Sequence, residues 1–189
     1  MIKTIIKLDT WLKENRNEFY KKLNKGLTDT EIQVWEDKFG FKFPEDFKNL
    51  YQWRNGQKAE NRECFFYHQY FDPIEVVYEQ WEFGNEDLTE FNEDDSIVWG
   101  ESWLRFTSAI DSNGYCLDVK GDFKEVGAIV YYIHDDENEV LFANLETMLE
   151  MILNQFEQGV YGYAEVDETV SFVVINPIKA KEISHYYTI

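Results

Sequence analysis

The sequence predicts an α+β protein: a single domain in which a largely antiparallel, twisted sheet is flanked by helices. Helical apolar spacings dominate the first 57 residues and recur at 145–158, whereas short aromatic and β-branched runs fill most of the chain between them. These runs do not alternate with helices as the strands of a parallel sheet must. With 189 residues, 44% of them hydrophobic, the chain can bury roughly 70% of its unfolded surface in one core.

The N-terminal part predicts three helices. An amphipathic helix is expected over 8–23, beginning at Asp9 or Thr10 and ending near Gly26. Two shorter helices with well-marked ends follow within 27–57, and they make this stretch the best-defined part of the chain.

The first of these two helices carries signals at both of its ends. Thr28 and Glu31 have the spacing of a capping box, in which a hydroxyl and a carboxylate satisfy two amide groups at the helix start. Ile32 and Phe39 share the apolar face. Gly40 can adopt the left-handed conformation that ends a helix.

The second helix begins at Pro44, because the first helical position needs no N–H group, and Asn55-Gly56 ends it in a turn. The aromatic run 63–71 predicts a strand. Apolar residues at helical spacing then predict a helix from Pro73 to about residue 82, which could continue in broken form to residue 91.

The remaining chain predicts strands and one further helix. Short runs within 96–119 predict strands, and 126–133 and 140–143 predict a hairpin. The segment 145–158 predicts a strongly amphipathic helix, capped by Asn144 and ended by Gly159. A final strand at 169–175 and a tail complete the chain.

The distribution of charge is strongly asymmetric. The formal net charge is −19, yet residues 1–62 hold 13 basic and 10 acidic side chains, whereas residues 63–178 hold 3 basic and 26 acidic ones. Such a field repels nucleic acid and anionic membranes, and it steers a basic partner towards the protein. The alternative is that the charge serves solubility alone.

The most promising binding constellation joins carboxylates to a tryptophan. Residues 82–95 carry seven carboxylates and no cation, and Trp99 and Trp103 follow them. Aromatic residues beside charge are favoured at protein interfaces. The candidate partner-binding residues are Glu82, Glu86, Asp87, Glu90, Glu93, Asp94, Asp95 and Trp99. The alternative is a solvated loop beside core tryptophans, and we expect a packing role of that kind for Trp103.

No catalytic residue, cofactor site or metal site is expected. The segment 134–137, with Glu139, lacks the alternating spacing and central Gly of an EF-hand loop, which favours a polar hairpin tip over a cation site. His68 and His185 stand in no recognisable nucleophile context. The glycines are scattered at turns, so no phosphate-binding loop is present.

The cysteines and the apolar segments indicate a cytoplasmic protein. Cys64 and Cys116 are isolated and predict reduced, buried thiols rather than a zinc site or a disulfide. The N-terminal residues contain no apolar segment of signal-peptide length, and no other segment approaches the roughly 20 apolar residues that span a bilayer.

The order of these signals resembles that of the SUKH superfamily, the group typified by yeast cell-wall assembly regulator-like proteins. In that family a helix ends in Gly, an apolar residue and Pro open a second helix, and Asn-Gly ends it. A Trp-apolar-Pro-Phe element, an Asp and Gly turn, a Leu-Asp strand, a strand that starts with Gly and a closing helix follow. The matching positions here are Gly40, Phe43-Pro44, Asn55-Gly56, Trp103-Leu104-Arg105-Phe106, Asp111 to Gly114, Leu117-Asp118, 127–133 and the helix from Asn144.

The resemblance covers a core of about 27–158 within a single domain of residues 1–189. The N-terminal helix 8–23 and the C-terminal extension 159–189 lie outside this core. Arg105 stands where the family tends to have Pro, which leaves the geometry of that strand open.

The resemblance implies an α+β fold with a largely antiparallel sheet. It also implies that many bacterial members are immunity proteins, which bind and neutralise toxin domains, often nucleases, delivered by neighbouring cells of the same kind. No catalytic residues come with the family. We therefore expect a non-enzymatic protein whose acidic surface binds a basic toxin. The alternative is a regulatory or scaffold module that binds a peptide or small ligand in an aromatic cleft.

Overall fold

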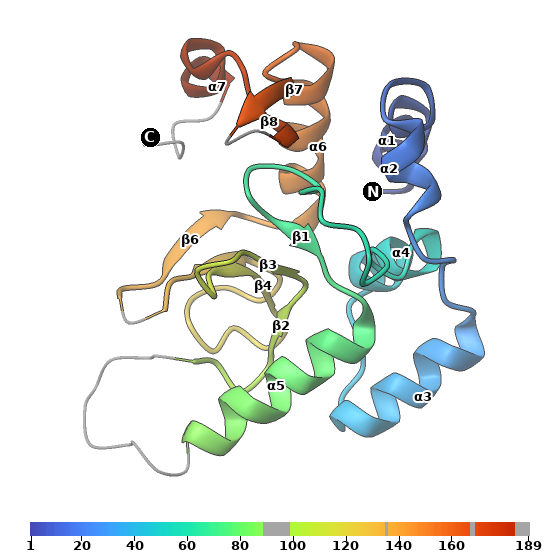
Figure 1. Ribbon diagram of the computed structural model, residues 1–189. Coiled ribbons are helices and arrows are strands. Elements are labelled where there is room, and N and C mark those ends of the chain that lie inside the picture. Colours follow the sequence, from blue (N-terminus) through green and yellow to red (C-terminus); the bar gives the residue numbers. More distant parts are fainter. Residues whose placement is uncertain (89–98, 135, 167–168, 184–189) are drawn as a thin grey trace.

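The computed structural model describes residues 1–88, 99–134, 136–166 and 169–183, and it shows helices arranged around small antiparallel sheets (Figure 1). The helices are α1 (Ile2–Asn15), α2 (Asn17–Lys21), α3 (Asp29–Phe39), α4 (Glu45–Trp53), α5 (Ile74–Leu88), α6 (Leu145–Glu157) and α7 (Pro177–Ile183). The strands are β1 (Tyr70–Phe71), β2 (Trp103–Arg105), β3 (Thr107–Ser108), β4 (Gly114–Asp118), β5 (Ile129–Tyr132), β6 (Glu139–Phe142), β7 (Tyr161–Val166) and β8 (Thr169–Val174). The protein therefore has the predicted α+β fold.

All strand pairs in the described residues are antiparallel, as predicted. Strands β2, β4, β5 and β6 form one sheet in that order, β1 pairs with β3, and β7 pairs with β8. The predicted hairpin is formed by β5 and β6, with Val130 opposite Val140. β2 pairs with β4 through Arg105 and Cys116, so Arg105 continues a regular strand.

The helices lie on different sides of the four-stranded sheet (Figure 1). α5 runs below the sheet and contacts β2, whereas α6 lies above it and contacts α1, α4 and β6. The main core draws its buried side chains from Ile5 in α1 to Ala180 in α7. A second cluster of Trp99, Trp103, Cys116 and Val130 packs separately, because successive strand residues point to opposite faces. None of the helices in these segments combines the length and apolar composition that crossing a bilayer requires.

The predicted ends of α3 are confirmed. The Thr28 N–H donates to Glu31 Oε2 at 2.7 Å, and the Glu31 N–H donates to Thr28 Oγ1 at 3.3 Å, which completes the capping box. Gly40 ends the helix with a φ of 75°. These contacts span only three residues, which is why the sequence pattern alone could specify them.

The ends of α5 and α6 also follow their sequence signals. α5 begins directly after Pro73 and continues to Leu88, beyond the predicted end near residue 82. Asn144 caps α6 by accepting a hydrogen bond from the Thr147 N–H at 2.9 Å. Gly159, with a φ of 65°, follows the last turn as predicted.

The predicted helix over 8–23 is wrong in its extent. The helix begins at Ile2, because Ile5 already belongs to the buried stripe that continues with Leu8 and Leu12. The chain then breaks at Arg16, which has a φ of −136° and separates α1 from α2. Arg16 turns its side chain into the protein, where it is 2% exposed.

The predicted strand over 63–71 is also wrong, since only Tyr70–Phe71 is a strand. Phe66 and Gln69 instead bridge a tight turn in which Tyr67 has a φ of 25° and His68 a φ of 56°. The aromatic side chains on either side are buried, so the composition resembles that of a strand although the backbone turns.

Two C-terminal elements were not predicted. β7 was missed because its burial does not alternate cleanly, and it pairs with β8 over its whole length. The expected tail forms α7, which begins with Pro177 after Asn176. The Asn176 side chain accepts a hydrogen bond from the Lys179 N–H at 3.1 Å, so a recognisable cap was present in the sequence.

Candidate partner-binding surface

One face of α5 presents an uninterrupted row of carboxylates. Glu75, Glu79, Glu82 and Glu86 are all exposed. Because successive helical residues are 100° apart, these four positions fall within an arc of roughly 60°. The helix contains no Lys, Arg or His. Glutamates four residues apart repel one another, so this arrangement costs helix stability.

The opposite face of α5 fixes the helix against the core. Ile74 and Val77 are fully buried. Tyr78 and Trp81 contact Phe39 of α3, with ring centroids 5.0 and 5.1 Å apart. The carboxylate row therefore points outwards from a firmly held helix.

Phe83 places an exposed aromatic ring beside these carboxylates. Its side chain is 67% exposed, and its position on the helix borders the row formed by Glu79, Glu82 and Glu86. Glu82 also accepts a hydrogen bond from the Tyr78 hydroxyl at 2.7 Å, which raises the pKa of Tyr78. The sequence analysis did not identify Phe83 as an exposed ring beside these carboxylates, although the sequence already shows its spacing from Glu79, Glu82 and Glu86.

Trp99, unlike Phe83, is not exposed. The sequence analysis expected it among the partner-binding residues, and its buried position corrects that expectation. It is 7% exposed and packs against Trp103 and Tyr132, with centroid separations of 5.8 and 5.4 Å. Its ring also lies so close to Gly84 of α5 that a Cβ atom there would overlap it. Trp99 thus packs beneath the C-terminal half of α5, and Trp103, fully buried, has the expected packing role.

The structure brings only part of the predicted site together. Glu82 and Glu86 lie on the exposed face of α5, and Asp87 belongs to the same helix. Glu90, Glu93, Asp94 and Asp95 lie outside the described residues. The row of carboxylates extends instead towards the start of α5, to Glu79 and Glu75, which the sequence analysis did not include.

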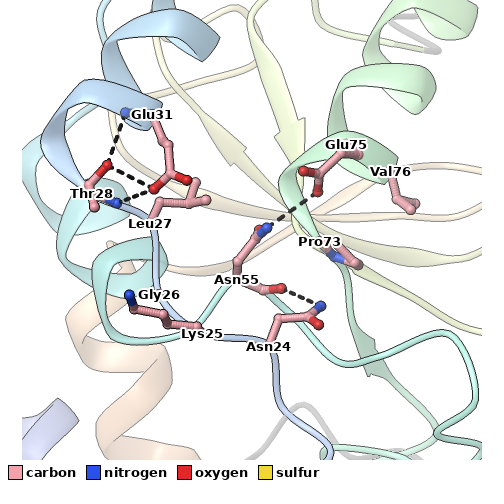
Figure 2. Close-up of a pocket in the computed structure, with 10 residues that line it drawn as sticks. All are labelled: Asn24, Lys25, Gly26, Leu27, Thr28, Glu31, Asn55, Pro73, Glu75 and Val76. Atoms are coloured by element: carbon pink, nitrogen blue, oxygen red, sulfur yellow. Dashed lines mark hydrogen bonds between the residues drawn. The ribbon is translucent and has the colours of Figure 1, made fainter.

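A pocket of about 490 Å³ adjoins the N-terminal end of this row (Figure 2). Its lining residues are Asn24, Lys25, Gly26, Leu27, Thr28, Glu31, Asn55, Pro73, Glu75 and Val76. None of these residues is aromatic, so this pocket gives no support to a ligand site in an aromatic cleft.

Asn55 holds this end of α5 in place. Its Oδ1 accepts a hydrogen bond from the Ile74 N–H at 2.8 Å. Its Nδ2 donates to Glu75 at 3.3 Å, as Figure 2 shows. Asn24 Nδ2 donates to the Asn55 carbonyl at 2.9 Å. The Asn55-Gly56 turn therefore joins the chain before α3, the end of α4 and the start of α5.

A buried polar network fastens α5 to the sheets. Gln80 Nε2 donates to Asp72 Oδ2 at 3.2 Å, and the Ser108 hydroxyl donates to Asp72 Oδ1 at 2.9 Å. Arg105 Nε donates to Gln80 Oε1 at 2.7 Å. Burial raises the pKa of Asp72 to about 6, against the opposing effect of these hydrogen bonds and of the Arg105 charge. Sequence reasoning missed this network, because its members lie 8 to 36 residues apart.

The described residues contain no group of three or more His, Cys, Asp or Glu side chains that could hold a metal ion. Cys64 is half-buried and Cys116 is buried, and both are free thiols. Burial raises the pKa of both thiols, which disfavours the reactive thiolate.

A comparison with models of known protein families identifies the family to which the chain belongs. Residues 26–151 match the SMI1/KNR4 family (SUKH-1), and this match covers about two thirds of the 189 residues. The protein belongs to the SMI1/KNR4 (SUKH-1) family. Members of this family are generally non-enzymatic, and SUKH-domain proteins are commonly immunity proteins. A search of the curated proteins found no match to the chain.

Proposed function

We propose that the protein is a cytoplasmic, non-catalytic immunity protein that binds and neutralises a cognate toxin domain through an acidic surface. The observation that carries this proposal is the carboxylate face of α5, which borders the exposed ring of Phe83. Membership of the SUKH-1 family supports a binding role. A toxin that acts on nucleic acid presents a cationic groove, and an acidic binder can cover that groove without performing any chemistry.

The carboxylates and the aromatic ring have different roles in this proposal. Glu79, Glu82 and Glu86 attract the basic partner over a distance and raise the association rate, an effect that salt screens. Phe83 loses water on contact and slows dissociation, as buried aromatic anchors do. We propose that the contact continues through Asp87, Glu90, Glu93, Asp94 and Asp95, while Trp99 supports α5 from below.

The test is a charge reversal on the α5 face. In the triple variant Glu79→Lys, Glu82→Lys and Glu86→Lys, the association rate with the toxin domain encoded by the neighbouring gene should fall at least about tenfold at low salt and much less at high salt. Stopped-flow or surface-plasmon-resonance measurements at two salt concentrations would show this. Protection of cells that express the toxin should fall in parallel.

A matched control separates the site from the total charge. The variant Glu14→Lys, Glu150→Lys and Glu157→Lys changes the net charge by the same amount through exposed residues of α1 and α6. Its association rate should fall less than that of the α5 variant. Equal effects of the two variants would remove the α5 face from the proposal. A wild-type protein that neither binds nor protects against the toxin would contradict the immunity function itself.

A substitution of Phe83 tests the anchor. Phe83→Ala should increase the dissociation rate by about tenfold or more while leaving the salt dependence of association unchanged. Val126→Ala is a suitable control, since Val126 is also apolar and is 70% exposed but lies in the connection between β4 and β5.

A further inference from the structure

The hairpin of β7 and β8 presents a sheet edge that carries no charge. β8 pairs with β7 on one side, and among the strands that the structure describes none pairs with its other side. The sequence of β8, TVSFVV, contains no charged residue, no proline and no glycine. Proteins commonly protect an exposed edge with a charge, a proline or a bulge, because an unprotected edge accepts a strand from another chain.

The register of the hairpin shows which backbone groups of β8 face this edge. The Ile175 N–H donates to the Val160 carbonyl at 2.8 Å, and these two residues lie opposite each other when the register is continued by one pair. Bonded and non-bonded pairs alternate along an antiparallel ladder, so every second residue back from Ile175 also bonds to β7. Val170, Phe172 and Val174 therefore direct their N–H and C=O groups away from β7. The register contains no bulge that would turn these groups aside.

The other outer strands in the described part of the chain are short or charged. β1 and β3 have only two residues each. β2 contains Arg105 and is covered by its contact with α5. β6 contains Glu139 and β7 contains Glu165, and both carboxylates are exposed. The edge of β8 is thus the one that lacks these protections.

Exposed apolar side chains lie along the same strand. Val170 is 74% exposed, and Ile175, which directly follows β8, is 53% exposed. A strand that paired with β8 would cover apolar surface on these side chains and would also bond to the outward backbone groups. Both contributions favour the addition of a strand at this edge.

The charge of the protein indicates which chain can supply that strand. A basic partner would find no carboxylate on β8. A second copy, with its own net charge of −19, is repelled by most of the surface but not by an uncharged strand. β8 is also complementary to itself. When two copies pair about a two-fold axis, Phe172 lies opposite Phe172 of the second copy and Val170 lies opposite Val174, so each outward residue can exchange both of its hydrogen bonds.

We propose that the protein forms a symmetric dimer in which the β8 edges of two copies pair and join the two hairpins into one antiparallel sheet. The hairpin lies above the four-stranded sheet, whereas α5 runs below it (Figure 1). The dimer therefore leaves the carboxylate face of α5 accessible. The proposal does not rest on the toxin-binding function, because it uses a different surface and a different partner.

Sedimentation equilibrium of the purified full-length protein tests the dimer. The wild type should show a reversible equilibrium between monomer and dimer over a series of protein concentrations. The dimer should be favoured at high salt, because salt screens the repulsion between two acidic copies. This dependence is opposite to that expected for the binding of a basic partner to α5. A wild type that stays monomeric at every protein and salt concentration would overturn the proposal.

Proline substitutions distinguish the two edges of the hairpin. Val170→Pro removes an N–H that faces the β8 edge. Its control is Glu165→Pro, because Glu165 is the residue directly opposite Val170 and its N–H faces the β7 edge. Neither N–H takes part in the pairing of β7 with β8. Val170→Pro should raise the dissociation constant of the dimer at least about tenfold, and Glu165→Pro should change it less than about twofold.

A charge at the edge provides a second test that keeps every backbone group. Val170→Asp should also weaken the dimer at least about tenfold, whereas Val126→Asp adds the same charge at a side chain that is 70% exposed in the connection between β4 and β5. This pair decides the result if Val170→Pro does not show the unfolding curve of the wild type. A dimer that the substitutions at Val170 leave intact, or that the control substitutions weaken equally, would show that β8 does not form the interface.

Discussion

The guanidinium group of Arg16 lies over the ring of Phe172, with 3.6 Å between the Arg16 Cζ atom and the ring centroid. The same group donates to the carbonyls of Cys64 and Phe65 at 2.8 and 2.7 Å and forms an ion pair with Glu63. Arg16 and Phe172 lie outside the segment that matches the family, whereas residues 63–65 lie inside it. Arg16 thus connects both ends of the chain to the family core, and we propose that all three parts unfold as one unit.

Replacement of Arg16 tests this connection. Arg16→Ala should lower the free energy of unfolding by about 3–5 kcal/mol, because it leaves Glu63 and two carbonyl groups without their buried partner. Urea denaturation followed by circular dichroism would measure the change, with a single transition in the wild type. Lys21→Ala, which removes an exposed ion pair with Glu18, should change little. Two separate transitions in the wild type would contradict the single-unit proposal.

The buried carboxyl group of Asp72 predicts a specific pH dependence. Its pKa is about 6 in the folded protein against an ordinary value of 3.8, so between these values the folded state holds a proton that the unfolded state releases. Stability should therefore fall as the pH rises through this window, by about 3 kcal/mol for this group alone.

Asp72→Asn should remove that contribution. The variant should be more stable than the wild type above pH 6, and the difference should shrink towards pH 4. Thermal unfolding across pH 4–7 would follow it, and Asp136→Asn provides a control that removes one carboxylate from an exposed turn. An unchanged difference between variant and wild type at pH 4 and pH 7 would show that Asp72 does not titrate in this window.

Two left-handed glycines differ in the room available to a side chain. Gly40 has a φ of 75° and nothing within 4 Å of an added Cβ atom, so Gly40→Ala should cost only the conformational strain of about 1 kcal/mol. Gly56 has a φ of 65°, but a Cβ there would overlap the backbone of Asp72 and Pro73. Gly56→Ala should cost about 3 kcal/mol or more. Chemical denaturation compares the two variants directly, and similar losses would contradict the close approach at Gly56.

The strain at Ser112 can be relieved without loss of a side-chain contact. Ser112 is exposed with a φ of 68°, and its carbonyl accepts the hydrogen bond from Arg105. Ser112→Gly should therefore raise the unfolding free energy by about 1 kcal/mol. Ser112→Ala keeps a Cβ in the same conformation and should give no such gain. Differential scanning calorimetry of both variants distinguishes strain at Ser112 from a general effect of removing the hydroxyl.

The carboxylate face of α5 was only partly accessible to sequence reasoning. Glu82 and Glu86 were identified from the density of acidic residues, but the helix was expected to end near residue 82, so its register could not define a face. Because α5 continues to Leu88, Glu79 and Phe83 lie beside Glu82 and Glu86 on the same helix. Trp99 was misplaced because a hydrophobic residue next to an acidic segment can pack inwards or outwards, and only its contact with Gly84 decides between these two positions.

The sequence by itself determined those features whose partners lie within one helical turn or one strand repeat. Thr28 and Glu31, Gly40, and Asn144 with Thr147 specify helix ends through contacts of three or four residues, and the same signals, in order, identify the SUKH family. The tertiary structure alone decided where the helix breaks at Arg16, because the groups that draw its side chain inwards lie 47 to 49 residues further along the chain. A local pattern cannot encode a contact whose free energy arises only after distant segments have packed together.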